Sequence, residues 1–566
     1  QSGIRWTPEL CVSAQPTAGR TLNFERDSQP RTQVTQAQSG IHTTDTHAMC
    51  PSAASPGRNA PLLHTASSTA ESERRRVGTC SLVVIGFFWV SGGIYGSEDL
   101  LSAGPPLVIF GFVLTVALTF ALPNALMTAE LATFLPADGG QVAWVYEALG
   151  SVGHHNALWV WLCNLLDAAV YPQLAASYGS HALRLDPSQS QAIAYCFVGG
   201  VCLLNLCGLA AVTASQTFCF ALALTPCLAF TAAGLPRLDL SAVAASEGDV
   251  AWELLLSWAV WLYSGFSSLG SMAGEVRTPQ LTYPLAVALL LPLVTLLNVV
   301  PFAVALSVDP VREHFTAGYF GELADSLGGR PLRASFSAGA IVSLLGLYHS
   351  QILAAERTSL AVAAVVDARA SGAALPHASP PADYPSASPA HTESRAATGA
   401  VSRLCASLVR WMRAEPPCGG APHWAVLLNA ACAFGLAQLP YSSLVEVEMT
   451  LYCASHLFFL AAFLALRVQR PHAARLFRVP GGTLAAAAYC VPPLLICVAT
   501  VAANTLALRD PAATDATVAL RLAALALVAT SAVHLAVRRV AGTASGSPPE
   551  DSEPAGGSEP PARAIH

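Results

Sequence analysis

Long apolar stretches recur along this sequence and limit its fold more than any other feature. A helix that crosses a bilayer needs about 20 mostly apolar residues, because lipid offers no hydrogen bonds to exposed backbone groups. Such stretches recur from about Cys80 to Val540, in a chain of 566 residues of which 11 % are charged and 53 % are hydrophobic. A soluble protein of this size would carry more charge. The pattern predicts an all-α membrane protein that crosses the bilayer many times.

Twelve candidate spans can be counted in this pattern, and the ninth and tenth have little loop between them. The spans cover residues 80–102, 106–134, 157–182, 190–210, 213–236, 252–274, 282–307, 334–362, 423–444, 446–467, 483–507 and 517–538. Segments that face the cytoplasm carry an excess of Arg. Most arginines fall on the side that holds both ends of the chain. Both termini are therefore predicted to be cytoplasmic.

Three segments are too polar to lie in the bilayer. Residues 1–76 are rich in Thr, Ser and Gln, and residues 541–566 are rich in Pro, Gly and Glu. Both are predicted to be disordered cytoplasmic tails. Residues 367–421 contain a Pro/Ala/Ser-rich run that predicts a cytoplasmic linker. The membrane part is thereby divided into residues 77–366, with eight spans, and residues 422–540, with four.

Two spans contain clusters of Gly and Ser. The first span carries "SGGIYGSED", and the sixth carries "WLYSGFSSLGSMAGE". Five spans separate them, which is the period of a five-plus-five inverted repeat, and paired interruptions of this kind indicate a transporter's binding site. Unwound backbone is tolerable in a membrane where it lines a wet cavity or binds a solute. The competing interpretation is a glycine seam that lets helices pack closely.

The interrupted segments supply most of the predicted substrate-binding residues. Unwinding would free backbone N–H and C=O groups to bind a solute. The predicted residues are Ser91, Gly92, Gly93, Ile94, Tyr95 and Gly96 in the first span, and Trp261, Tyr263, Ser264 and Gly265 in the sixth.

Asp167 is an acidic residue in the middle of the third span. Ionisable groups inside a membrane are costly and point to function. Tyr171 lies one turn further along on the same face, and Pro172 loosens the next turn. No basic residue lies within this span. A cationic substrate, a proton or an Arg from another helix must therefore compensate the charge, or the carboxylate hydrogen-bonds to broken backbone. Asp167 and Tyr171 are both predicted to bind substrate.

Three further acidic residues are predicted to attract cations or to form a gate. Glu98 and Asp99 follow the first interruption, and we expect them toward the outer mouth, where a cation would arrive. Glu275 ends the sixth span. We expect it to pair with Arg277 or with another Arg at an inner gate.

The other acidic residues near span ends have less specific interpretations. Glu130, near the inner end of the second span, is interpreted as an interfacial or helix-packing residue. Glu446 and Glu448 stand at the predicted start of the tenth span, where they either attract cations at the outer face or lie in a solvated loop. The sequence contains no nucleotide-binding, metalloprotease or hydrolase motif. We therefore expect no enzyme activity, no cofactor and no metal site.

Several motifs resemble the amino acid–polyamine–organocation superfamily. They are "GGIYGSED", "ALPNALMTAELATFLPADGGQVAWVYEALG", "WVWLCNLLDAAVYP", "AGEVRTPQLTYP" and "EVEMTLYCASHLFFLAAFLALRVQRPHAARLFRVPGG". Together they run through most of the membrane part. They are most similar to the polyamine and basic amino acid transporters of plants and trypanosomatid-like protists. The chain departs from that branch in its linker, in its tails and at Ser267, where the plant proteins carry an acidic residue.

The resemblance implies a leucine-transporter-like fold in which broken helices 1 and 6 hold the solute. It places Trp261 where an aromatic gate closes, and a Trp face also suits an ammonium group. The implied function is proton-coupled import of polyamines such as putrescine or spermidine. The expected partners are a small-molecule substrate, H⁺ and the lipid bilayer, with no nucleic acid. The plasma membrane is the expected location, and the oligomeric state stays open.

Two alternatives remain open at this point. One is an amino acid permease of the same fold, because backbone at the two breaks could hold a zwitterion without any charged side chain. Glu98, Asp99 and Asp167 favour a cation over that zwitterion. The other is a non-transporting sensor of amino acids or polyamines, with the 367–421 linker as its signalling arm.

Overall fold

The computed structural model describes residues 77–371 and 422–507, with gaps at 137–138, 184–185, 208 and 440, together with 526–529 and 531. All of these lie in one of the two compact units of the chain, His64–His566. The described residues form helices and contain no strand, only an isolated parallel bridge between Val77 and Val276. The predicted tails, the linker and nearly all of the twelfth predicted span lie outside the described residues.

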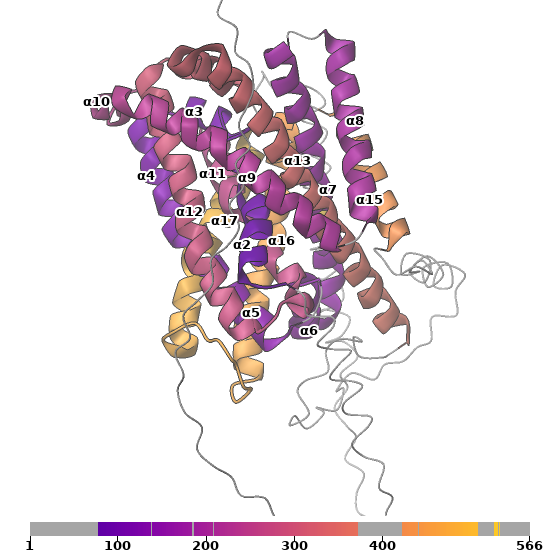
Figure 1. Cartoon of the computed structure of the whole chain (residues 1–566). Helices are drawn as coiled ribbons and strands as arrows, with labels where there is room; N and C mark the ends of the chain where they lie inside the picture. The colour runs from indigo at the N-terminus through magenta and orange to yellow at the C-terminus, as the bar shows by residue number, and fades with distance from the viewer. Residues whose placement is uncertain are drawn as a thin grey trace, which may run out of the picture. The chain divides into compact units, whose positions relative to one another are not determined.

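The described helices follow the predicted spans closely (Figure 1). In chain order they are α2 (Thr79–Val90), α3 (Asp99–Ser102), α4 (Pro106–Val116), η1 (Ala117–Ala121), α5 (Leu122–Phe134), α6 (Gln141–Leu149), η2 (Gly150–Val152), α7 (Gly153–Leu183), α8 (Pro187–Leu206), α9 (Leu209–Gly234), η3 (Leu235–Arg237), α10 (Leu240–Val243), α11 (Trp252–Ser264), η4 (Ser268–Ser271), η5 (Ala273–Glu275), α12 (Pro279–Val308), η6 (Arg312–His314), α13 (Tyr319–Ser371), α15 (His423–Leu436), α16 (Tyr441–Gln469) and α17 (Gly482–Leu506). The π-helical η1 joins α4 and α5 into one continuous rod.

Seven helices in the described part of the chain are long and apolar enough to cross a membrane. They are Pro106–Phe134, Ser188–Leu206, Ala211–Arg237, Pro279–Val308, Tyr319–Val365, Ser443–Gln469 and Gly482–Leu506. The apolar helices α2 and α15 are shorter, with 12 and 14 residues. The chain is therefore a helical protein with several membrane-spanning segments. The count of twelve spans and the inverted repeat stay predictions.

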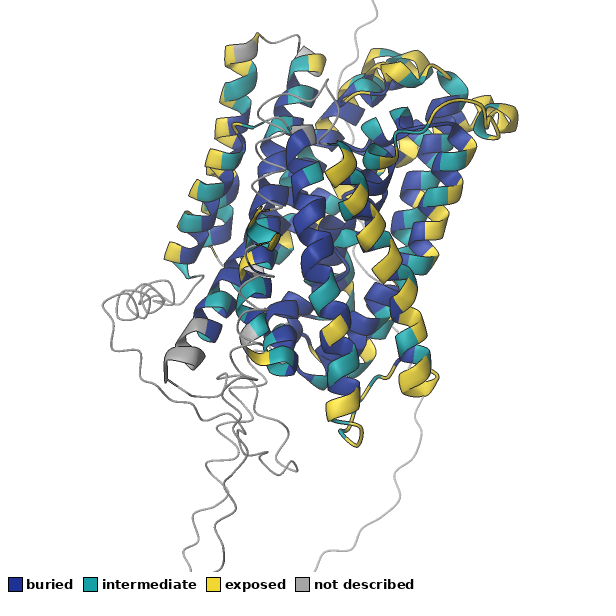
Figure 2. Ribbon diagram, turned by 180° about the vertical axis from the view of Figure 1, so that it is seen from behind, coloured by how far each residue is buried: buried dark blue, intermediate teal, exposed yellow. Residues whose placement is uncertain are grey.

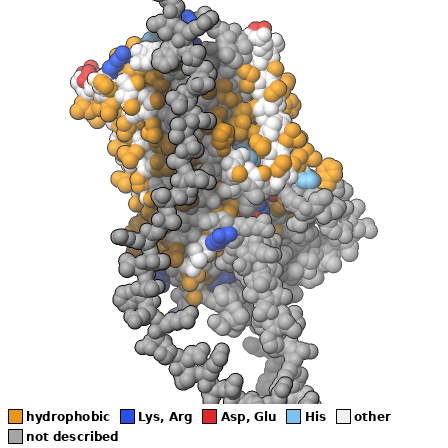
Figure 3. Space-filling model, viewed as in Figure 1, with side chains coloured by type: hydrophobic (Ala, Val, Ile, Leu, Met, Phe, Trp, Pro, Cys, Tyr) orange, Lys and Arg blue, Asp and Glu red, His pale blue; other side chains and the backbone are white. Residues whose placement is uncertain are grey.

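The helix surfaces show which side faces lipid. The interior is buried, whereas the outward faces of peripheral helices are exposed (Figure 2). Large apolar side chains lie on the exposed faces, and among the described side chains visible in Figure 3 most are hydrophobic. Examples are Leu118, Leu203, Leu228, Leu281, Leu289 and Leu484. An exposed apolar belt of this size suits lipid and not water.

Helices α7, α13 and α16 form the centre of the described bundle. Helix α7 packs against α13 and α16, and α2 packs against α9, α12 and α13. Helix α13 begins at Tyr319 and is kinked at Gly328 and Gly329, where Gly329 has a φ of +66°, so its second part starts close to the predicted residue 334. The structure corrects one predicted span boundary. Helix α16 begins at Tyr441 and not at residue 446.

Candidate functional site

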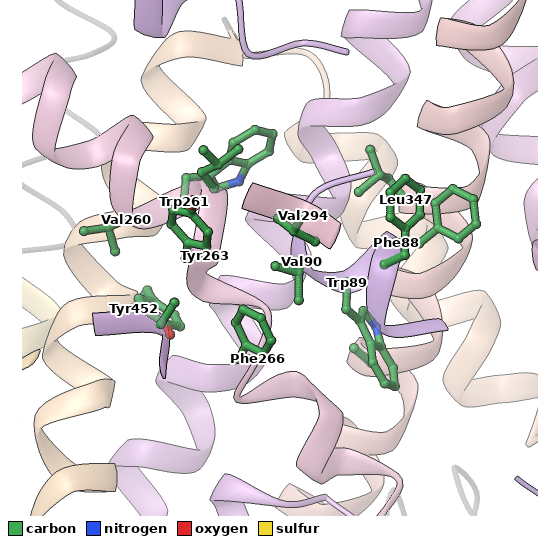
Figure 4. Close-up of a cluster of buried hydrophobic side chains, with 14 of the residues drawn as sticks. Phe88, Trp89, Val90, Val260, Trp261, Tyr263, Phe266, Val294, Leu347 and Tyr452 are labelled. Carbon is green, nitrogen blue, oxygen red and sulfur yellow. The ribbon is translucent and has the colours of Figure 1, made fainter. Parts of the chain in front are cut away.

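The two predicted interruptions are real breaks, and they touch each other. Helix α2 ends at Val90, and Gly92, Gly93 and Gly96 follow with φ of +64°, +99° and +83°. These left-handed angles are easy only for Gly. Helix α11 ends at Ser264. A Cβ atom on Gly265 would lie 1.9 Å from the carbonyl oxygen of Trp89, so the second break packs directly on the end of α2. Figure 4 shows the apolar side chains around this crossing.

Neighbouring helices hold the backbone of the first break. The Ser343 hydroxyl on α13 donates to the carbonyl oxygen of Gly92. The Asn298 amide on α12 donates to Ser91 Oγ at 3.0 Å, and that hydroxyl donates to the Gly93 carbonyl oxygen at 3.1 Å. Further along, the Tyr95 hydroxyl donates to the Ala223 carbonyl oxygen at 2.7 Å. These bonds satisfy polar groups that lipid cannot.

Side-chain hydroxyls also donate hydrogen bonds to backbone carbonyl oxygens of the second break. The Tyr452 hydroxyl on α16 donates to the Ser264 carbonyl oxygen at 2.9 Å, and the Ser267 hydroxyl donates to the same oxygen at 3.2 Å. The Tyr283 hydroxyl on α12 donates to the Leu269 carbonyl oxygen at 2.7 Å. Hydrogen bonds from side chains therefore hold both unwound segments in a defined conformation.

A polar cavity lies beside the second break, among α7, α11, α13 and α16. Its volume is about 30 Å³, which is room for one or two water molecules. It is lined by Gln141, Val160, Cys163, Asn164, Asp167, Ser264, Gly265, Ser267, Ser268, Gln351, Glu448, Tyr452 and Ser455. The described lining contains two carboxylates and no Arg or His.

Asp167 is held at the cavity by two aromatic side chains that the sequence also identified. Tyr171 donates its hydroxyl to Asp167 Oδ1 at 2.7 Å, and Trp261 Nε1–H donates to the same oxygen at 3.1 Å. The rings of Tyr171 and Trp261 stack at 29° with centroids 6.4 Å apart. The carboxylate is 7 % exposed. The structure thus brings Trp261 on α11 to Asp167 and Tyr171, which lie one turn apart on α7.

Glu448 is a cavity residue that the sequence interpretation placed elsewhere. A solvated loop or the outer face was expected, but Glu448 lies two turns inside α16 and is 3 % exposed. It lines the same cavity as Asp167. The error follows from the span boundary, because "EVE" lowers the local hydropathy and placed the helix start too late. A helix predicted to run without interruption from Tyr441 would have placed Glu448 inside the span.

Only some of the predicted binding residues line the cavity. Asp167, Ser264 and Gly265 line it. The predicted residues of the first span pack within the first break instead, and they are Ser91, Gly92, Gly93, Ile94, Tyr95 and Gly96. Tyr263 points away, toward Thr295 on α12, with its hydroxyl 3.3 Å from Thr295 Oγ1. Ser267, where the chain departs from the plant branch, is part of the lining. Their role in binding a solute stays a prediction.

The three residues predicted to attract cations or to gate occupy different settings. Glu98 is fully buried, and its Oε1 accepts bonds from the Tyr178 hydroxyl and from the Gly318 N–H. Its charge is therefore not displayed at a surface in this conformation. Asp99 begins α3 and is partly buried. Glu275 forms an ion pair with Arg357 on α13 at 2.7 Å, so an Arg from another helix is one of its partners, and its role in a gate stays a prediction.

Glu130 forms a buried ion cluster that joins two of the quoted motifs. Glu130 and Arg467 are each only 1 % exposed and form a paired contact, and Arg475 Nε lies 3.1 Å from Glu130 Oε1. The Val479 N–H donates to Glu130 Oε2 at 2.8 Å. Arg467 also donates to the carbonyl oxygens of Val479 and Gly482. The cluster joins α5 to Arg467 on α16 and to the segment between α16 and α17, so Glu130 is a packing residue.

The described residues offer no group of three or more His, Cys, Asp and Glu side chains placed to hold a metal ion.

Comparison with known proteins gives consistent matches. Residues 77–364, just over half of the chain, match the model of a family described as amino acid permease. The chain is 28 % identical over 438 residues to a probable polyamine transporter of Arabidopsis thaliana, a match that covers 76 % of this chain and 82 % of the relative. It is 29 % identical over 441 residues to a polyamine transporter of Oryza sativa subsp. japonica, covering 77 % and 75 %. A shorter match, 29 % over 301 residues, covers 51 % of this chain and 66 % of an uncharacterized transporter of Mycobacterium bovis.

Proposed function

This chain belongs to the amino acid permease family, and from that premise we propose that it is a secondary transporter that imports polyamines together with protons. The observation that carries the proposal is the cavity at the second break, which contains Asp167 and Glu448 and no basic lining residue among those described. A buried carboxylate is costly unless a cation or proton balances it. Relatives of this chain bear the name polyamine transporter, which supports the same substrate class.

The small cavity volume supports a transporter conformation that lies between an outward-open and an inward-open state. A space for one or two water molecules cannot hold putrescine, so the solute has to enter by a rearrangement around the breaks. The Gly-rich breaks and the Glu275–Arg357 pair are the elements we propose to move. In this proposal α2 with α3, and α11 with η4, are the broken helices 1 and 6 of a twelve-span, five-plus-five repeat.

Proton coupling is proposed from the same carboxylates. A carboxylate in a closed, nearly dry cavity can be neutralised by a proton when the cationic solute leaves. No ATP-binding motif occurs in the sequence, so a gradient has to supply the work. The plasma membrane and cytoplasmic tails remain part of the proposal, and protease access to residues 367–421 from outside intact cells would contradict that topology.

Amino acid transport is the second candidate. The description of the matching family favours it, and backbone at the breaks could hold a zwitterion. Against it, a substrate carboxylate would meet Asp167 and Glu448 with no basic residue in the described lining to accept it. A substrate sensor is the third possibility, and it predicts binding without flux.

Uptake by the purified chain in proteoliposomes separates these functions. Labelled putrescine, spermidine, arginine and a neutral amino acid are each supplied with and without an inward proton gradient. We expect the two polyamines to accumulate and the gradient to increase their uptake. Accumulation of the amino acids alone would overturn the polyamine assignment. Substrate binding without any uptake would identify a sensor.

A further inference from the structure

We propose that Glu448 binds the second ammonium group of the substrate and so selects doubly charged amines over singly charged ones. The proposal rests on the proposed polyamine function and adds a specificity residue to it. Glu448 on α16 and Asp167 on α7 line one cavity from different helices. In this proposal each carboxylate takes one end of the solute when the cavity opens.

The unpaired atoms in the cavity wall identify the missing chemistry. Glu448 Oε2 and Gln351 Oε1 are buried and have no hydrogen-bond partner among the described residues. Both side chains are 3 % exposed, and both line the cavity. Each of these atoms is an acceptor that lacks a donor. An ammonium group carries three N–H donors and no acceptor, so it matches what the wall lacks.

Asp167 and Glu448 differ in which of their oxygens accept hydrogen bonds. Asp167 Oδ1 accepts bonds from Tyr171 and Trp261, which orient that carboxylate. Glu448 keeps one oxygen, Oε2, that accepts no hydrogen bond from the part of the chain that the structure describes. Leaving a buried charged acceptor unsatisfied is expensive, and a second ammonium on the solute would remove that penalty. The oriented carboxylate thus takes the first ammonium, and the unsatisfied carboxylate takes the second.

The same arrangement disfavours an amino acid. A zwitterion has a carboxylate that brings only acceptors, and it would add a third anion next to the unsatisfied oxygens of Glu448 and Gln351. Among the described lining residues no cationic side chain is present to offset that repulsion. Charge selection therefore follows from the wall itself.

The test compares putrescine with 4-aminobutan-1-ol, which has the same chain length but a hydroxyl in place of one ammonium. Both are measured as competitors of labelled putrescine on the purified full chain in proteoliposomes. We expect the wild-type protein to prefer putrescine. We expect Glu448→Gln to lose about 10- to 150-fold in putrescine affinity, as for one charge-assisted hydrogen bond, and to leave 4-aminobutan-1-ol nearly unchanged.

Glu446→Gln is the matched control, because it removes the same charge from the same helix at a position outside the cavity. It should keep the wild-type preference. If Glu448→Gln keeps that preference as well, or loses only its response to the proton gradient, Glu448 is not the second ammonium site and the inference fails. If wild-type protein neither binds nor transports putrescine, the proposed function itself fails, which is a separate result.

Discussion

Asp167 shows how a single residue can hold a charge at the centre of a membrane protein. Its carboxylate stays buried because Tyr171 and Trp261 direct two donors at one oxygen. Hydrogen bonds to a charged group contribute about 1.5–3 kcal/mol each. The remaining face of the carboxylate is turned to a cavity whose described lining offers no cationic partner. Asp167 is therefore fixed in position, and we propose that its charge is what a cationic solute binds.

Replacing Asp167 by Asn keeps the size of the side chain and removes its charge. We expect putrescine and spermidine affinity to fall about 10- to 150-fold, the equivalent of about 1.5–3 kcal/mol. A neutral amino acid should be affected less. Competition binding on the purified variant provides the measurement. If all solutes weaken equally and the protein yield also falls, the role of Asp167 is structural. Unchanged affinity and unchanged proton dependence would remove Asp167 from the site.

Sequence reasoning located part of this site, for identifiable reasons. Asp167 stood out because it is a lone charge in an apolar span, and Tyr171 because it lies one turn away. The contact with Trp261 joins residues 94 positions apart, so no local pattern could measure it. Ser343 and Asn298, which hydrogen-bond to the first break, come from two later helices, so the sequence could not predict these contacts either.

At the level of elements, the fold is joined by buried polar contacts as well as by apolar packing. The apolar stretches predicted most helix bounds within a few residues, and the Gly clusters predicted both breaks. The predicted start of the eighth span, residue 334, lies just after the kink of α13 at Gly328 and Gly329. Hydropathy did not predict the helical residues that precede this kink from Tyr319. It also could not show that the "ELATFLPADGG" and "LRVQRPHAARLFRVP" motifs meet at Glu130.

Replacing Glu130 by Gln should destabilise the protein strongly. The change leaves Arg467 buried without its anionic partner, and breaking one half of a buried ion pair costs about 3–5 kcal/mol. We expect a lower melting temperature in detergent and a lower yield. Glu147→Gln is the matched control, since its pair with Arg470 is partly exposed and such pairs contribute about 0.2–1 kcal/mol. Equal melting temperatures for the two variants would contradict this account.

Replacing Gly265 by Ala tests the contact between the two breaks. The φ of Gly265 is −68°, so Ala introduces no backbone strain, but its Cβ would overlap the Trp89 carbonyl oxygen. Separating α11 from α2 should abolish transport. Gly199→Ala in α8 is the control, because no atom lies within 4 Å of its added Cβ. Uptake at the wild-type rate by Gly265→Ala would show that the breaks can move apart freely.

At the scale of the whole molecule, transport requires the closed cavity to open. The Glu275–Arg357 pair joins η5, after the second break, to α13. Both side chains are mostly buried, at 14 % and 18 % exposure, so the pair is more than a surface contact. It is the charged link that we propose must break when the molecule opens at that end.

Replacing Arg357 by Gln should therefore open the cavity more often. Cys163 lines the cavity and can report this, because a thiol reacts with maleimide only when solvent reaches it. We expect faster alkylation of Cys163, measured by peptide mass spectrometry. Arg333→Gln, which breaks a more exposed pair with Asp325, should leave the rate unchanged. Exchanging the two charges in Glu275→Arg/Arg357→Glu should restore slow labelling. A slow rate in the single variant would show that the pair does not close the cavity.

The isolated bridge between Val77 and Val276 gives the segment before α2 a mechanical role. The Val77 N–H donates to the Glu275 carbonyl oxygen at 3.0 Å, and the Arg277 N–H donates to the Val77 carbonyl oxygen at 2.8 Å. The start of α2 is thereby stitched to the residues on either side of Val276. A force that draws residue 77 away from the bundle has to rupture both hydrogen bonds, and it loads the backbone of Glu275 before it reaches α2. A force on the segment before α2 would therefore act first on the backbone around Glu275, next to its ion pair with Arg357.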